Sequence, residues 1–210
     1  MFTGIVTAVG NIVEVKPAVE HSAYDSGVQL LIHAKDFLRS DTKVGDSIAI
    51  QGACMTVTSM ARKGDIDAFT VDVSRESLNR TTGLGVTGQV NLEHSMRLGD
   101  TLDGHMVSGH VDGLGVVTSF VQVGESWELK IQVPPELARF MAYKGSVTVN
   151  GVSLTVNSVT DNANGCKVSI NLIPHTLQVT TLKNLEEGQK VNLEVDLIAR
   201  YVERMLQYGK

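Results

Sequence analysis

The sequence predicts an all-β protein: two tandem homologous barrels, each with a short helix, followed by a C-terminal helix. An internal repeat is the first observation, because residues 52–57 (GACMTV) and 151–156 (GVSLTV) match at an offset of 99 positions. The flanking segments keep this register, since 47–51 lies over 146–150 and 69–73 lies over 168–172. A chain of 210 residues fits two domains of about 100 residues each. Many short strands with one short helix per repeat favour small closed antiparallel barrels.

The expected strands are rich in Val, Ile and Thr and are bounded by Gly, Pro or polar residues. Residues 146–149, the Asn150-Gly151 turn and residues 154–159 predict a hairpin, because Asn-Gly is a strong turn signal. In the first half Gln51 takes the place of this asparagine and is a poorer turn residue. Residues 16–27 are polar and predict a loop. The other strands, each with its partner in the second half, are 2–15 and 107–120, 28–32 and 127–133, 69–73 and 168–173, and 90–94 and 191–195.

One short helix is expected in each half, before the hairpin. Pro134 and Pro135 open the second-half helix, and Gly145 ends it. Lys144 lies at the expected C-terminal end, where a cation is favourable against the helix dipole. Residues 34–40 are the shorter first-half version of this helix.

After Asp196 the apolar residues recur at helical spacing, and Asp196 itself is a good N-cap residue. This C-terminal helix has no counterpart in the first half. Its apolar stripe either joins subunits or packs on its own barrel, and the pattern does not decide between them. The expected domains are residues 1–97, 98–195 and 196–210. The stripe consists of Leu197, Ile198, Tyr201, Val202, Met205 and Leu206.

The composition narrows the class of protein. The net charge of −5 gives no electrostatic support for nucleic-acid binding. The two cysteines lie at non-equivalent positions of the two halves and do not form a disulfide framework. The N-terminal residues lack the positive region of a secretory signal, and no stretch reaches the roughly 20 apolar residues of a membrane span. The sequence therefore predicts a cytosolic protein that contacts neither nucleic acid nor membrane.

At three places the second half carries a more reactive residue than the first. Each has a structural alternative: a histidine in a strand can be a core or surface residue, a serine after a turn is common, and an aspartate before a helix can be a cap. Cys54 can be a small buried apolar residue. His105 and His110 are five positions apart with no Cys or Glu to complete a metal site, so we expect no metal. No phosphate-binding loop or dinucleotide motif is present, and we expect no cofactor. The three replacements are Ile5 by His110, Cys54 by Ser153, and Ser95 by Asp196.

Four segments closely resemble the alpha-chain type of riboflavin synthase: residues 1–6 (MFTGIV), 104–113 (GHMVSGHVDG), 150–156 (NGVSLTV) and 172–177 (LIPHTL). The resemblance implies two six-stranded Greek-key barrels that bind lumazine, and a C-terminal helix that assembles a homotrimer. It also implies a transferase that dismutates two 6,7-dimethyl-8-ribityllumazine molecules by four-carbon transfer, without metal or cofactor. The products are riboflavin and 5-amino-6-ribitylaminouracil. Association with lumazine synthase is a further implied partner.

The resemblance also implies which residues form the site. Lys144 matches a residue that reaches the ligand of a neighbouring subunit. Positions associated with catalysis are His110, Ser153, Thr155, Asp196 and Cys54. In the first half, the substrate-binding segments are Gly4, Ile5 and Val6; Cys54, Met55 and Thr56; and Asp72, Val73, Ser74, Arg75, Glu76 and Ser77. In the second half, they are Gly109, His110 and Val111; Ser153, Leu154 and Thr155; and Asn171, Leu172, Ile173, Pro174, His175 and Thr176.

Three departures from the family pattern stand out: Gln51 replaces Asn, Asp103 replaces Gly, and His94-Ser95 replaces Arg-Ala. Of these, Gln51 is expected to alter the first-half turn and weaken that pocket. The alternative function is a non-catalytic lumazine- or flavin-binding protein of the same fold. Such relatives lose the second-half Ser, His and Thr set, whereas Ser153, His110 and Thr155 are present here.

Overall fold

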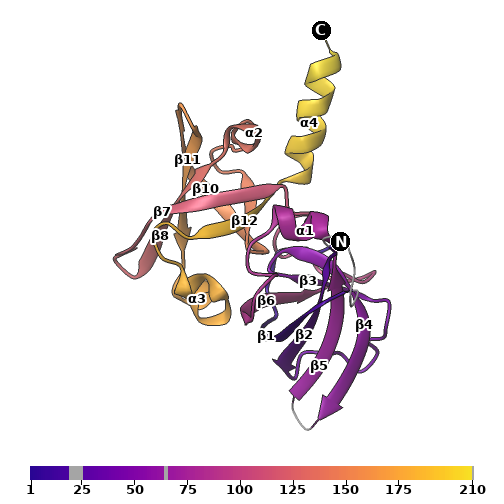
Figure 1. The fold of residues 1–210 in the computed structure, drawn as a ribbon. Helices are drawn as coiled ribbons and strands as arrows, with labels where there is room; N and C mark the ends of the chain where they lie inside the picture. The colour runs from indigo at the N-terminus through magenta and orange to yellow at the C-terminus, as the bar shows by residue number, and fades with distance from the viewer. Residues whose placement is uncertain (19–25, 64–65, 210) are drawn as a thin grey trace.

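The computed structural model describes residues 1–18, 26–63 and 66–209. Its strands form two closed antiparallel barrels of six strands each, which lie side by side (Figure 1). The first barrel has the order β1-β2-β5-β4-β3-β6, and the second repeats it as β7-β8-β11-β10-β9-β12. This is a Greek-key order, because strands that are not consecutive in sequence pair with one another: β2 with β5 and β3 with β6, and equally β8 with β11 and β9 with β12. The predicted fold class of two homologous barrels is confirmed.

The equivalent strands have similar lengths in the two barrels. Those of the first barrel are β1 (Ala8–Pro17), β2 (Val28–Lys35), β3 (Ser47–Ile50), β4 (Ala53–Lys63), β5 (Ile66–Val73) and β6 (Gly88–His94). Those of the second are β7 (Gly113–Val123), β8 (Ser126–Val133), β9 (Ser146–Val149), β10 (Val152–Asn162), β11 (Gly165–Leu172) and β12 (Lys190–Val195). The helices are α1 (Arg75–Arg80), α2 (Pro135–Ala138), α3 (Pro174–Val179), the 3-10 turn η1 (Thr181–Asn184) and α4 (Leu197–Tyr208).

Each barrel closes around its own apolar core. Along β2, Leu30 and Ile32 are fully buried, and the equivalent Leu129 and Ile131 of β8 are fully buried as well. Alternate residues point outward, as the period of two in a strand requires. The outward-facing side chains of β4 and β10 are therefore accessible outside the cores, as the exposure of Thr56 and Thr155 shows.

The first strand of each barrel begins later than the sequence predicts. β1 begins at Ala8 and β7 at Gly113, although the apolar pattern predicts strands from residues 2 and 107. The residues before them instead run between the two barrels, where Phe2 and Val107 form a short antiparallel bridge. Of the expected loop at 16–27, residues 16–17 belong to β1, and residues 19–25 lie outside the described part of the chain.

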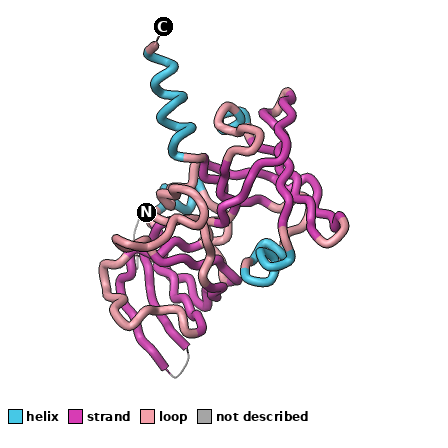
Figure 2. The backbone as a smooth tube through the Cα atoms, turned by 180° about the vertical axis from the view of Figure 1, so that it is seen from behind, coloured by secondary structure: helices cyan, strands magenta, loops and turns pink. Residues whose placement is uncertain are grey.

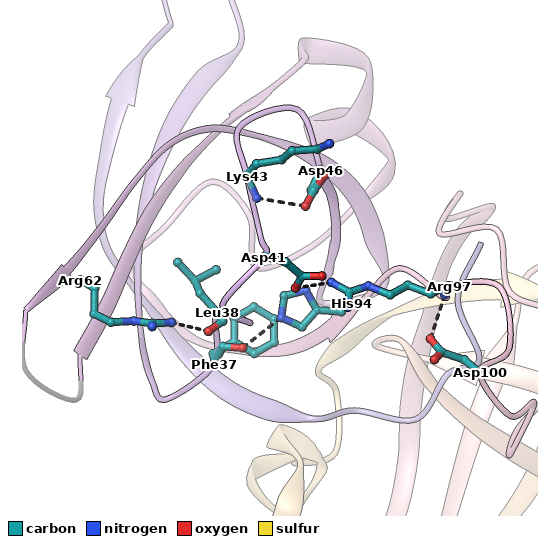
Figure 3. A network of polar contacts seen from close by, with 9 residues as sticks. All are labelled: Phe37, Leu38, Asp41, Lys43, Asp46, Arg62, His94, Arg97 and Asp100. Atoms are coloured by element: carbon teal, nitrogen blue, oxygen red, sulfur yellow. Dashed lines mark hydrogen bonds and ion pairs between the residues drawn. The ribbon is translucent and has the colours of Figure 1, made fainter.

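The short helix predicted at residues 34–40 is wrong. β2 continues to Lys35, and the chain then turns at Asp36, whose φ of 45° breaks a right-handed helix. Side chains from other strands stabilise a non-helical conformation of this segment. The Leu38 N–H donates to the buried Asp67 carboxylate at 2.6 Å. His94 stacks on Phe37, with 4.3 Å between ring centroids, and its Nε2 lies 3.0 Å from the Phe37 carbonyl oxygen (Figure 3).

The second-half helix is shorter than predicted. α2 covers Pro135–Ala138 only, and Lys144 follows in the left-handed region with a φ of 60°. Lys144 is exposed, and its Nζ donates to Asn157 Oδ1 at 3.3 Å, so the prediction of a helix-capping lysine is wrong. The helices at equivalent positions of the two halves are α1 and α3, which each follow the fifth strand of a barrel. The sequence analysis did not identify either.

The two hairpin turns have the same geometry despite their different residues. Gln51 and Asn150 both have a φ of 51°. The Gln51 side-chain oxygen accepts the Asn91 N–H at 2.9 Å, and the Asn150 side-chain oxygen accepts the Asn192 N–H at 2.8 Å. The expectation that Gln51 alters this turn is therefore wrong, since its longer side chain reaches the equivalent donor.

α4 projects away from both barrels in opposite views (Figures 1 and 2). The Asp196 side chain accepts the Ile198 N–H at 2.8 Å, which confirms the predicted N-cap. The apolar side chains along the helix remain exposed, with Met205 at 71% and Leu206 at 68%. The interpretation that this stripe packs on its own barrel is therefore wrong. Within the described residues, no helix is long and apolar enough to span a membrane.

Candidate functional site

The two barrels exchange the segments that precede their first strands. The Gly4 carbonyl oxygen accepts the Ser153 N–H of the second barrel at 2.7 Å. Reciprocally, the Gly109 carbonyl oxygen accepts the Cys54 N–H of the first barrel at 2.7 Å. Val6 packs against the core of the second barrel, and Val111 packs against that of the first. Grouping these segments by sequence half is therefore wrong, because each lies on the opposite barrel.

This exchange defines two half-sites that differ from the groups expected from sequence. The Ser153 half-site comprises residues 4–6, 153–155 and 171–176. The Cys54 half-site comprises residues 109–111, 54–56 and 72–77. Val156 pairs with Ile170 in the Ser153 half-site, and Val57 pairs with Val71 in the Cys54 half-site. The two strand segments of each half-site therefore lie next to one another.

Glycine is required where the exchanged segments meet the hairpins. A Cβ on Gly4 would lie 2.6 Å from the Ser153 Cβ, and one on Gly109 would lie 2.8 Å from the Cys54 Cβ. Both glycines also have positive φ angles, 76° and 77°, which L side chains rarely adopt. Glycine at these two positions therefore lets the exchanged backbone lie directly against Ser153 and Cys54.

Strand alternation decides which predicted binding residues can offer a side chain. Ser153 is half-buried and Thr155 is exposed on the outer face of β10, and Thr56 is exposed on β4. Four other predicted binding residues point into the barrel cores, so only their backbone atoms can reach a ligand there. These four are Met55, Val73, Leu154 and Leu172.

The segments that follow β5 and β11 have matching architecture. Each leaves the strand through one exposed residue, Ser74 or Ile173, and enters a helix of six residues, α1 or α3. The Ser74 hydroxyl oxygen accepts the Ser77 N–H at 3.1 Å and caps α1. Pro174 begins α3, where its missing N–H costs no hydrogen bond. The two predicted segments thus lie at equivalent ends of their barrels.

A buried amide network joins the barrels next to the half-sites. A Cβ on Gly52 would lie 2.7 Å from the Gly151 nitrogen, so the hairpin tips touch. The Asn91 amide donates to the Asn150 carbonyl oxygen at 2.9 Å, and Asn192 donates to the Gln51 carbonyl oxygen at 2.9 Å. Each turn is thereby bonded to the other barrel, which fixes the relative position of the half-sites.

His105 is a site residue that the sequence analysis considered only as a metal ligand. Its Nδ1 lies 2.7 Å from Ser153 Oγ, and its backbone N–H donates to the Thr3 carbonyl oxygen at 3.1 Å. Burial lowers the pKa of His105, and the charge of Asp196 partly opposes this shift. A neutral imidazole can accept the serine proton at Nδ1, so the pair can act as a general base.

His110 belongs to the other half-site, where it follows Gly109 and takes the place that Ile5 has in the Ser153 half-site. It is exposed and lines a cavity of about 480 Å³ with Arg80, Asp112 and Arg200. Asp112 accepts the Val195 N–H at 2.8 Å and pairs with Arg200, which connects this cavity to the base of α4.

The structure divides the predicted catalytic set between the two half-sites. Ser153 and Thr155 lie on one strand, and the field of Asp196 reaches their neighbour His105. Cys54 lies beneath the segment that carries His110. The Lys144 side chain donates to Asn157, which belongs to neither half-site. Among the described residues, no three His, Cys, Asp or Glu side chains gather as potential metal ligands.

Comparison with known proteins identifies the family. The lumazine-binding domain model matches twice, at residues 3–95 and 108–196. Riboflavin synthase from Brucella abortus is 41% identical over the whole of both chains. Riboflavin synthase from Photobacterium leiognathi is 37% identical, over 100% of this chain and 91% of the relative. The chain belongs to the riboflavin synthase family. It is therefore an enzyme of the transferase class built from two lumazine-binding domains.

Solved structures of LumP share the fold of this riboflavin synthase family member. LumP complexed with 6,7-dimethyl-8-(1'-D-ribityl) lumazine has a TM-score of 0.73 at 24% identity and covers 93% of this chain and 99% of its own. LumP complexed with riboflavin has a TM-score of 0.71 at 25% identity, with the same coverage. These likenesses agree with the duplicated barrel architecture.

Proposed function

We propose that this chain catalyses the dismutation of two molecules of 6,7-dimethyl-8-ribityllumazine. A four-carbon unit passes from one molecule to the other and gives riboflavin and 5-amino-6-ribitylaminouracil. The two products together contain the atoms of the two substrates, so the reaction balances without an oxidant or a reductant. The observation that carries the proposal is the pair of related but unequal half-sites, since two copies of one ligand must be treated differently.

The Ser153 half-site supplies the base. The ring methyl group of the lumazine is acidic, and its carbanion is the carbon nucleophile of the reaction. Its proton passes to His105 Nδ1 by way of the Ser153 hydroxyl, and the electron pair stays on the ring system of the substrate. Asp196 favours the imidazolium that forms, because its charge raises the pKa of His105.

The Cys54 half-site activates the second lumazine. The Cys54 thiol, or a water molecule in its place, adds to the ring of this acceptor; its proton passes to a ring nitrogen, and the nucleophile and this proton leave again in the later elimination. His110 and Thr155 complete the two half-sites, and the backbone of the remaining segments holds the rings. Placing two rings face to face is largely an entropic task, with a contribution of up to about 7–11 kcal/mol.

A direct assay tests the activity. Purified protein given the lumazine should form riboflavin and the aminouracil in equal amounts, measured by absorbance after separation. A LumP-like binding protein would instead hold the lumazine and leave its spectrum unchanged with time. Lumazine that stays intact at saturating protein would overturn the proposed activity.

The working site lies between subunits of a homotrimer, in this proposal. The exposed apolar stripe of α4 supports assembly, and the exposed position of Lys144 leaves its side chain accessible to a neighbouring subunit. A cytosolic location is also proposed, and the free thiols of Cys54 and Cys166 support it.

Subunit mixing tests where the site lies. Thr56→Trp blocks the Cys54 half-site, and Thr155→Trp blocks the Ser153 half-site; both positions are exposed and equivalent in the repeat. Each variant alone should be nearly inactive. After joint unfolding and refolding, mixed oligomers should regain activity, because some junctions receive one intact half-site from each chain. Mixed oligomers that are verified by mass spectrometry and remain inactive would place the site within one chain.

A further inference from the structure

Two buried glutamates hold the exchanged segments by the same set of bonds. Glu93 of β6 accepts the Thr3 N–H at 2.7 Å, the Thr3 hydroxyl at 2.8 Å and the Gly4 N–H at 3.0 Å. Glu194 of β12 accepts the Ser108 N–H at 2.7 Å, the Ser108 hydroxyl at 2.6 Å and the Gly109 N–H at 3.0 Å. The two sets are equivalent under the internal repeat.

Each carboxylate is almost fully buried, with exposures of 5% for Glu93 and 3% for Glu194. Burial raises the pKa of both groups, and the hydrogen bonds from the held segments oppose that shift. A buried carboxylate is unfavourable for a fold unless its oxygens are satisfied. The three donors of the exchanged segment are the groups that satisfy them, so each glutamate is specific to that segment.

The segment that each glutamate holds also contacts the opposite barrel. Directly after its bonds to Glu93, Gly4 bonds to Ser153 on the second barrel. Directly after its bonds to Glu194, Gly109 bonds to Cys54 on the first barrel. The glutamate thus sets the place of the backbone that lies against the reactive side chain of the other barrel.

We propose that Glu93 and Glu194 are crossed positioning residues, each fixing the segment that completes the half-site of the opposite barrel. Glu194 on the second barrel controls the surroundings of Cys54 on the first, and Glu93 on the first controls those of Ser153 on the second. The link to catalysis rests on the proposed function. The crossed control itself does not, because it concerns only the position of the segments.

Thiol labelling of the native protein tests this crossed control. Cys54 is half-buried beneath Gly109, whereas Cys166 is fully buried in the second core. Glu194→Gln replaces one carboxylate oxygen by an amide NH₂, which cannot accept the hydrogen bonds of Ser108 or Gly109. This substitution should therefore release the segment that contains Gly109. The reaction of Cys54 with a disulfide reagent should then become about tenfold faster, the factor expected from losing a charge-assisted hydrogen bond. The labelling of each cysteine is read by peptide mass spectrometry.

Glu93→Gln is the matched control, because it removes an equally buried carboxylate with the same bonds from the other barrel. It should leave Cys54 labelling unchanged. Cys166 labelling should stay slow in both variants, which separates a local release from global unfolding. In a chain carrying Cys54→Ser and Ser153→Cys, the pattern should reverse: Glu93→Gln speeds labelling of the thiol at 153, and Glu194→Gln does not.

Equal effects of the two variants on Cys54, or no effect of either, would overturn the proposal. If Glu194→Gln does not fold, Ser108→Ala and Thr3→Val remove one bond from each set and give the same comparison. Riboflavin formation should fall in both glutamate variants. The labelling needs no substrate, so a chain that bound lumazine without converting it would still test the crossed control.

Discussion

Replacing His105 by asparagine separates proton transfer from hydrogen bonding at Ser153. His105 Nδ1 lies 2.7 Å from Ser153 Oγ, and an asparagine amide places a polar atom close to the same position. His105→Asn therefore keeps a hydrogen bond to the serine but cannot take up its proton. We expect kcat for riboflavin formation to fall by about 10²–10⁴-fold, which corresponds to about 3–5 kcal/mol. Ser153→Ala should cost a similar factor, and the double variant little more, because the pair acts as a unit.

The pH profile adds a second measurement to this prediction. Burial lowers the pKa of His105, so the neutral base is the working form at neutral pH. The rate should fall as the pH drops through this lowered pKa, below the ordinary value of about 6.5. Steady-state rates between about pH 5 and pH 8 in matched-ionic-strength buffers would show this acid limb. A His105→Asn variant that kept the wild-type kcat and the same acid limb would refute the assignment of His105 as the base.

Three further predictions concern the turn, a buried histidine and the C-terminal helix. Gln51 has a left-handed φ, which asparagine tolerates better than glutamine. Gln51→Asn should therefore raise the free energy of unfolding, measured in urea, by up to about 1 kcal/mol, and Asn150→Gln should lower it by a similar amount. Changes of the opposite sign would refute this. Burial lowers the pKa of His94, so the unfolded chain protonates first, and stability should fall by up to about 1.4 kcal/mol per pH unit below about pH 6.5. His94→Gln should flatten this slope, and an unchanged slope would contradict it. Deleting residues 197–210 should give a monomer by light scattering with little activity, whereas an unchanged oligomer would show that α4 does not assemble it.

Much of the architecture could be predicted from the sequence, because the repeat and the alternation of apolar and polar residues are both visible in short stretches of the chain. Strand and hairpin positions follow from side chains that alternate between core and solvent. The prediction of a helix at residues 34–40 was wrong because Asp67 and His94 form hydrogen bonds to that segment from other strands. Such tertiary contacts are not visible in local composition.

Without the family resemblance, the sequence indicates candidate site residues only where the two halves differ. Comparing halves indicated Ser153, Cys54 and His110, but His105 has no counterpart, because the same offset would place it before Met1. Glu93 and Glu194 are identical in the two halves, so a search for differences passes over them. The exchange of segments also could not be predicted, because it depends on the packing of one barrel against the other.

The exchange leads to a prediction about the isolated first half. Residues 1–97 alone would leave Val6 without the second core and Cys54 without Gly109. The bonds of the exchanged segments, Ser153 N–H to Gly4 and Cys54 N–H to Gly109, are equivalent under the repeat, so a second copy of this half can supply them. We expect this fragment to form a symmetric dimer in which Gly4 of one copy accepts the Cys54 N–H of the other. Analytical ultracentrifugation should show a folded dimer, and Gly4→Val should disrupt it, because the added side chain would meet the partner's Cys54. A folded monomer would show that the first barrel does not need the exchanged segment.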